Sequence, residues 1–254
     1  IFDEEDCKEL SEPYRPGKLR EMSFANVISM VKEYRSLYGF YSDDLVGDYK
    51  RTIERLQKEQ REAIEQLFSS FGNVLYSELH DFLNHGHEWI AAYDESLASV
   101  HGLDFTDLIC GVHRLFQDPV VRERWRSRYS YISVDEMQDT GVLEYKVLEM
   151  LWEGNYVLLC GDYFQTIYEW RGSDPFRLLK QFDADFKPLK IIFYENYRSN
   201  WTLFTMAFKT LQNMFPDLVG SIYTELPRAN SESKGKPVLI KGCKNSYLEG
   251  RYIY

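Results

Sequence analysis

Three short β-rich segments in the second half of the chain constrain its fold most strongly, because a helical segment follows each of them. The segments are 129–134, 156–160 and 190–194, and the helical patterns after them cover 141–152, 175–182 and 200–214. Alternation of strands and helices is typical of a parallel sheet with right-handed crossovers. The second segment is apolar from Val157 to Cys160, which predicts a strand covered on both faces.

Polar residues follow each predicted strand at its carboxyl end. Asp135 and Glu136 follow the first strand, Gly161 and Asp162 the second, and the polar run 196–198 the third. Ligands of open α/β sheets bind beyond the carboxyl ends of the strands, so these residues predict a site at one edge. Two adjacent carboxylates after a buried strand suit Mg²⁺-dependent phosphoryl transfer, in which one acid holds the metal and the other activates water. For a lone acidic pair, a solvated strand end with helix-capping acids is the alternative.

A helical unit is predicted ahead of the alternating part, over residues 22–97. Its clearest helix covers 49–68, where apolar residues fall near one face. Residues 1–20 are acidic and then rich in proline and basic residues, so we expect a loop or the end of another element there. Another helix opens within 103–109, with two candidate N-caps, Asp104 and Thr106.

The composition limits the classes of partner. The net charge is −10, from 30 Lys and Arg against 40 Asp and Glu. This net charge argues against a protein that binds nucleic acid by positive charge over its whole surface, but it is compatible with a local basic groove. Aromatic residues make up 16% of the chain, and we expect some of this surplus to stack on flat ligands such as bases.

The sequence shows no sign of a membrane or secreted protein. No apolar run approaches the roughly 18 residues that a membrane helix needs, and no secretory signal is visible. The four Cys residues lie far apart with no C-x-x-C pair, which argues against a zinc site and a disulfide framework. We therefore expect a reduced, cytoplasmic protein without a membrane partner. Because the chain starts at Ile1 rather than Met, we also expect it to be a fragment or a processed product.

Three motifs in the second half resemble those of one enzyme family. Residues 134–140 (VDEMQDT) closely resemble motif II of the UvrD/Rep-type superfamily 1 DNA helicases. Residues 159–172 (LCGDYFQTIYEWRG) are similar to motif III of this family, and 194–199 (YENYRS) to its motif IV. The motifs follow the family order and lie within 104–207. The helical region 22–97 resembles, by position and character only, the insertion that these helicases carry in their first motor domain.

The resemblance implies an α/β fold with an incomplete RecA-like parallel sheet of the P-loop NTPase type and a helical insertion subdomain. It implies four parts: 1–21 as a remnant of the first motor domain, 22–97 as the helical insertion, 98–187 as the first motor domain, and 188–254 as the start of the second.

The same resemblance assigns ATP and Mg²⁺ to the strand ends. Asp135 would organise Mg²⁺ and contact the nucleotide, and Glu136 would activate the attacking water. Gln165, near Asp162, would sense the γ-phosphate. Arg198 would reach the γ-phosphate from the second motor domain, where its cationic fork suits the charge of the transition state. Two further residues of motif II would link the nucleotide site to neighbouring motifs, namely Gln138 and Asp139.

Aromatic residues of motifs III and IV complete the implied set. Tyr197 would stack on the adenine, while Trp170 and Tyr168 would contact the bases of single-stranded DNA, with Arg171 nearby. Aromatic stacking is worth about 1–3 kcal/mol per base and tolerates any sequence. Without the other motifs, Tyr197 could instead pack in a core and Arg198 could cap a helix.

The phosphate loop of these helicases, G-x-x-x-x-G-K-[ST], does not occur in the sequence. Residues 16–19 (PGKL) lack its first glycine and its hydroxyl. We therefore expect a fragment of an ATP-dependent 3′→5′ helicase that acts on single-stranded DNA and duplex junctions in repair or recombination, and that is inactive alone. One alternative is a non-catalytic, helicase-derived module for DNA binding or protein interaction. Another is an unrelated α/β nucleotidase, which would leave Trp170 and the Tyr197–Arg198 pair unexplained.

Overall fold

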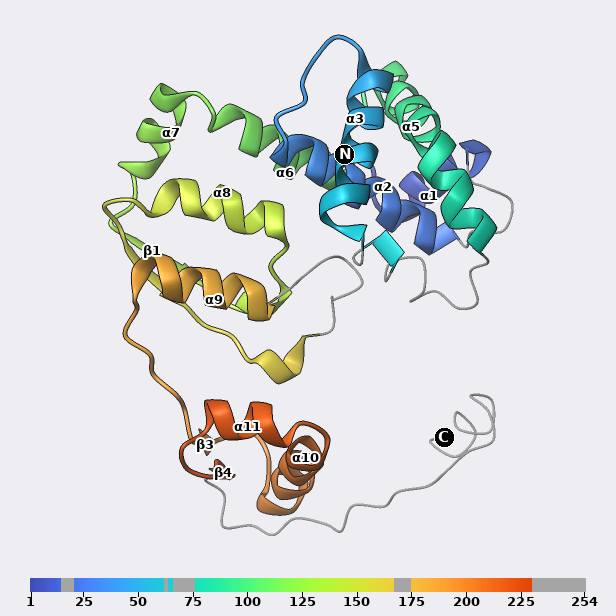
Figure 1. Cartoon of the computed structure of the whole chain (residues 1–254). Helices are drawn as coiled ribbons and strands as arrows, with labels where there is room; N and C mark the ends of the chain where they lie inside the picture. Colours follow the sequence, from blue (N-terminus) through green and yellow to red (C-terminus); the bar gives the residue numbers. More distant parts are fainter. Residues whose placement is uncertain (15–20, 62–63, 66–75, 167–174, 230–254) are drawn as a thin grey trace. The chain divides into compact units, whose positions relative to one another are not determined.

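The computed structural model describes residues 1–14, 21–61, 64–65, 76–166 and 175–229 (Figure 1). The chain divides into two compact units, Ile1–Phe186 and Lys187–Tyr254, and each unit is described by itself. Among the described residues, no helix combines the length and the apolar character that crossing a membrane requires.

The first part of the first unit is helical. It contains α1 (Glu4–Ser11), the short 3₁₀ helix η1 (Glu12–Tyr14), α2 (Glu21–Leu37), α3 (Leu45–Glu59) and α5 (Tyr76–Ser99). These helices enclose one apolar core, whose largest fully buried side chains are Tyr49, Tyr93, Phe24, Phe82, Ile53, Leu56 and Ile90. The helical unit predicted from the sequence therefore has a core of its own.

The structure corrects two local predictions in this part. Residues 4–11 form a helix rather than a loop, because Asp3 accepts hydrogen bonds from the backbone of Glu5 and Asp6 and so caps α1. The helix predicted over 49–68 is interrupted at Gln60, which leaves helical geometry with φ −135° and ψ 36°. Helix α3 therefore ends at Glu59, and residues 61 and 64–65 are helical again after the break.

A buried lysine ties this helical part to the rest of the unit. The Lys32 Nζ on α2 lies 3.0 Å from Asp94 Oδ1, 2.8 Å from Asp104 Oδ2 and 2.6 Å from Asp107 Oδ1. Burial by itself lowers the pKa of Lys32, but the three carboxylates outweigh it and hold the pKa above its ordinary value. We call this group the Lys32 cluster.

The Lys32 cluster also fixes the start of the next helix, α6 (Phe105–Leu115). Its N-cap is Asp104, one of the two candidates that the sequence predicted. The Asp104 side chain accepts a hydrogen bond from the Asp107 backbone N–H at 2.8 Å. The Asp107 side chain accepts from the Asp104 backbone in return. One acidic pair therefore both begins α6 and neutralises a buried cation from α2.

The second part of the first unit alternates strands and helices, as predicted. It contains α7 (Pro119–Arg126), β1 (Tyr131–Val134), η2 (Met137–Asp139), α8 (Val142–Trp152), β2 (Tyr156–Leu159), η3 (Tyr163–Gln165) and α9 (Pro175–Phe186). Strands β1 and β2 pair in parallel, with Tyr131 opposite Tyr156 and Val134 opposite Leu159. The β1–α8–β2 segment is thus the parallel strand–helix–strand unit expected from the sequence.

Only one face of this strand pair is covered by described residues. Ile132 and Val134 of β1 and Val157 and Leu159 of β2 pack on a second core, formed by Met137, Tyr145, Trp152, Leu178 and Phe182. On the other face, the Tyr131 and Tyr156 rings stack 5.1 Å apart and are 76% and 71% exposed. The prediction that β2 is covered on both faces is therefore wrong here, because no described element packs on that side.

The second unit contains β3 (Glu195–Asn196), α10 (Trp201–Met214), α11 (Pro216–Ile222) and β4 (Arg228–Ala229). Asn200 caps α10 through the Leu203 backbone at 3.0 Å, so the predicted helix 200–214 is confirmed. The strand predicted over 190–194 is wrong. Ile191 and Phe193 are exposed and have no strand neighbour among the described residues, whereas β3 begins at Glu195 and pairs in parallel with β4.

Candidate active site

The hydrogen bonding of β1 and β2 continues past the ends of both strands. The Cys160 backbone N–H donates to the Val134 carbonyl at 2.8 Å, and the Met137 N–H donates to the Cys160 carbonyl at 2.9 Å. These two bonds bring the polar residues after β1 beside those after β2. The convergence that the sequence predicted for the first two strand ends is therefore confirmed.

Four of the predicted site residues form one hydrogen-bonded chain at this edge. The Gln138 Nε2 donates to Glu136 Oε2 at 2.6 Å, and the Asp162 backbone N–H donates to Gln138 Oε1 at 3.0 Å. The Asp162 Oδ2 in turn accepts from Gln165 Nε2 at 2.8 Å. We call Glu136, Gln138, Asp162 and Gln165 the strand-end relay. Its central residue, Gln138, is buried, while Glu136 and Gln165 at the two ends are exposed.

Glu136 has an unusual backbone, with φ 51° and ψ 41°. The left-handed region is uncommon for residues other than glycine, and such strain persists only where the surroundings hold it. Here the Gln138 amide holds the Glu136 side chain, and the next residue, Met137, is fully buried. The turn that carries the two carboxylates is therefore fixed by the core behind it.

The residues at the edge fit a magnesium–nucleotide complex. Asp135 is exposed beside the relay, and one of its oxygens accepts the Glu136 backbone N–H at 2.9 Å. No group of three or more His, Cys, Asp or Glu side chains in the described ranges could hold a metal alone. Mg²⁺ takes one or two protein carboxylates and completes its shell with water and phosphate oxygens. The exposed Asp135 is therefore a ligand of the kind that such a complex uses.

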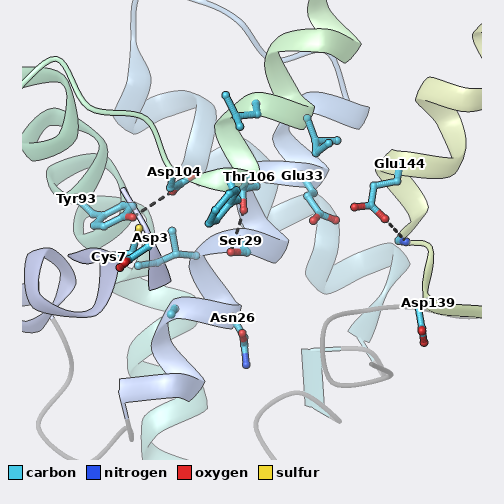
Figure 2. Close-up of a pocket in the computed structure, with 16 residues that line it drawn as sticks. Asp3, Cys7, Asn26, Ser29, Glu33, Tyr93, Asp104, Thr106, Asp139 and Glu144 are labelled. Carbon is cyan, nitrogen blue, oxygen red and sulfur yellow. Dashed lines mark hydrogen bonds between the residues drawn. The ribbon is translucent and has the colours of Figure 1, made fainter. Parts of the chain in front are cut away.

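Asp139 does not join the relay. Its Oδ1 is buried and has no hydrogen-bond partner among the described residues. Asp139 lines a pocket of about 660 Å³ that also contains Glu33 of α2 and Glu144 of α8 (Figure 2). Burial, and then the Glu144 carboxylate, raises the pKa of Glu33 to about 8. No short sequence pattern joins Glu33 to Glu144, so only the fold could reveal this acidic pocket.

Two predicted residues lie in the second unit. Tyr197 is 78% exposed, and its hydroxyl donates to Glu195 Oε2 at 2.8 Å, which raises the pKa of Tyr197 above its ordinary value. The Arg198 backbone donates to Asn196 Oδ1, and the residue is exposed. The strand-end relay belongs to the first unit, whereas Tyr197 and Arg198 belong to the second. That these two residues contact a nucleotide bound at the relay therefore stays a prediction. Three other predicted residues lie outside the described ranges, namely Tyr168, Trp170 and Arg171.

The family of the chain follows from comparison with known sequences. A profile described as the UvrD/REP helicase N-terminal domain matches residues 3–187. The chain belongs to this family. The match includes the whole strand-end relay, so the relay is part of the UvrD/REP helicase domain.

Curated relatives of this UvrD/REP segment have helicase names. DNA helicase II of Haemophilus influenzae is 32% identical over 171 residues, which are 65% of this chain and 23% of that protein. The ATP-dependent DNA helicase Rep of Buchnera aphidicola is 37% identical over 146 residues, 56% of this chain and 22% of the relative. The ATP-dependent DNA helicase PcrA of Staphylococcus aureus is 37% identical over 127 residues, 48% and 17% of the two chains. The chain thus matches less than a quarter of each of these relatives.

Proposed function

We propose that this chain is part of an ATP-driven DNA helicase, which we call the parent helicase. The parent moves 3′→5′ along single-stranded DNA and unwinds duplex junctions in repair or recombination. The strand-end relay carries this proposal, because it joins the acid of motif II to the amide of motif III through two hydrogen-bonded residues. The names of the relatives, among them Rep and PcrA, support it.

The chemistry that we assign to the relay is hydrolysis of the β–γ phosphate bond of ATP. Glu136 accepts a proton from the attacking water, and Gln165 contacts the γ-phosphate. Asp135 holds the nucleotide-bound Mg²⁺, which neutralises charge on the phosphate oxygens. Arg198 adds a cationic fork and Tyr197 stacks on the adenine. The exposed carboxylate of Glu136 and the exposed amide of Gln165 support these roles, because both are open to a ligand.

We propose the following domain organisation for the chain within this helicase. Residues 98–187 belong to a RecA-like first motor domain, 22–97 are its helical insertion, and 188–254 begin the second motor domain, with 1–21 a remnant of the first. The two separate apolar cores of the first unit support the distinction between insertion and motor. The division of the chain after Phe186 supports a second motor domain that starts there.

The DNA contacts that we propose come from motif III. Trp170 and Tyr168 stack on bases of single-stranded DNA, and Arg171 lies close to the strand. Stacking suits a helicase that must move over any sequence, since every base has a π-face. These residues follow Gln165 within a few positions in the sequence. This closeness supports a link between the nucleotide contact of Gln165 and the DNA contacts.

The missing phosphate loop gives the test of this function. Backbone N–H groups and the Lys of that loop hold the phosphates in related enzymes, so the 254-residue chain alone should hydrolyse no ATP. The parent helicase should hydrolyse ATP faster when single-stranded DNA is added. Steady-state phosphate release, measured for both proteins with and without an oligonucleotide, checks this. Absence of DNA-stimulated turnover in the parent would refute the proposal, and turnover by the chain alone would refute the role of the phosphate loop.

A second candidate is a non-catalytic module that binds DNA or protein. The missing phosphate loop favours it. The relay argues against it, because a module that only binds DNA has no use for a strained Glu136 held by a buried amide. This candidate would be established if the full gene encodes no phosphate loop and its product binds single-stranded DNA without hydrolysing ATP.

A further inference from the structure

We propose that Gly161 is a positioning residue for Glu136, because its missing side chain makes the room in which the Gln138 amide lies. Gly161 touches neither the nucleotide nor the DNA in this account, and it acts only through Gln138. The inference rests on the proposed function, since it concerns the residue that we take as the base. It adds a requirement that the motif resemblance does not state, namely that position 161 must carry no Cβ.

The space around Gly161 shows this requirement directly. A Cβ built on Gly161 would lie 2.6 Å from Gln138 Oε1, and 3.3 Å from the backbone nitrogens of Gln138 and Met137. The first distance is too short for two non-bonded atoms, so the Gln138 amide would have to move. Gly161 is not in the left-handed region, which in the described residues holds only two glycines, Gly39 and Gly154. Contact with Gln138, and not backbone strain, is therefore what excludes a side chain here.

The Gln138 amide cannot move without losing its orientation. The Asp162 N–H is a donor, so the amide must present Oε1 to it, and this leaves Nε2 facing the Glu136 carboxylate. Gln138 is buried, so water cannot easily replace either bond. If a Cβ at position 161 pushes Oε1 away, the bond to Asp162 breaks and the hold on Glu136 is lost with it. One missing methyl group thus sets the direction of the carboxylate.

A matched control exists in the same unit. Gly111 lies within α6, and a Cβ built there meets no atom within 4 Å. Gly111→Ala makes the same chemical change as Gly161→Ala without the contact. An effect that both variants share therefore comes from replacing glycine by alanine as such, and not from contact with Gln138.

The first experiment uses the 254-residue chain itself. Amide hydrogen exchange at Asp162 reports the bond from its N–H to Gln138 Oε1. We expect exchange at Asp162 to be roughly five- to tenfold faster in Gly161→Ala and in Gln138→Ala, the size expected for one lost hydrogen bond. Gly111→Ala should leave it unchanged. Equal exchange at Asp162 in Gly161→Ala and wild type would overturn the inference.

The second experiment measures kcat and KM for ATP in the parent helicase. Gly161→Ala should lower kcat by about tenfold or more with KM nearly unchanged, because the base is misdirected while the phosphate contacts remain. In a Gln138→Ala background the same substitution should cost less than about threefold, since the side chain it displaces is gone. Full additivity of the two substitutions, or a loss confined to KM, would contradict the positioning role.

Two variants of the parent helicase distinguish failure of the proposed function from failure of the positioning role. If Glu136→Gln retains wild-type turnover in the parent, the proposed base is wrong, and the inference about Gly161 fails with it. If Glu136→Gln abolishes turnover while Gly161→Ala behaves like Gly111→Ala, the proposed function stands and the positioning role alone is refuted.

Discussion

Replacement of Glu136 by glutamine is expected to abolish ATP turnover of the parent helicase while leaving ATP binding intact. The amide is nearly the size of the carboxylate and can still contact Gln138, but it cannot take a proton from water. Loss of a general base costs about 10²–10⁴ in kcat. Phosphate release under saturating ATP measures the loss, and fluorescence titration with a labelled nucleotide measures binding.

The Glu136→Gln experiment has a matched control on the helical part of the chain. Glu95 is an exposed residue of α5, so Glu95→Gln removes the same charge away from the relay and should leave kcat unchanged. If Glu136→Gln still turns over at the wild-type rate, another group is the base. If it loses binding and turnover together, Glu136 serves to hold the nucleotide and not to activate water.

The second large effect is expected on stability, when Lys32 is replaced by methionine. The change leaves Asp94, Asp104 and Asp107 around a site that has lost its only described cation. Removal of one partner from a buried ionic group costs about 3–5 kcal/mol, because the remaining charges stay desolvated. Urea unfolding of the 254-residue chain, followed by tryptophan fluorescence, measures the change in the free energy of unfolding.

The control for this variant is an exposed lysine in the same helical part. Lys50 of α3 is exposed, and Lys50→Met should change the free energy of unfolding by no more than about 0.5 kcal/mol. If Lys32→Met costs as little as Lys50→Met, the Lys32 cluster does not hold α2, α5 and α6 together. Such a result would mean that the three carboxylates find other partners or become protonated.

Local sequence patterns predicted the elements around the site well. The apolar runs before Asp135 and Gly161, and the helical spacing between them, gave β1, α8 and β2 with bounds close to those observed. Because parallel strands place their carboxyl ends at one edge, they also predicted that motifs II and III meet. The hydrophobic pattern and the motif resemblance led to the same prediction here, because both depend on residues that are close together in the sequence.

Other features could not be predicted, because they depend on partners distant in the sequence. The run 190–194 has strand-like composition, but a strand also requires a neighbour, and the structure pairs the later segment β3 with β4 instead. The Lys32 cluster joins Lys32 to three acidic residues that lie 62, 72 and 75 positions later in the sequence. The need for glycine at position 161 arises from one side chain on the neighbouring turn.

In the proposed function, ATP binds at the edge formed by the ends of β1 and β2. Amide hydrogen exchange in the parent helicase, measured with and without a non-hydrolysable ATP analogue and Mg²⁺, locates this binding site. We expect slower exchange on nucleotide addition at residues 135–138 and 161–165, and at Tyr197 and Arg198. Unchanged exchange in these segments, with protection elsewhere under saturating nucleotide, would contradict it.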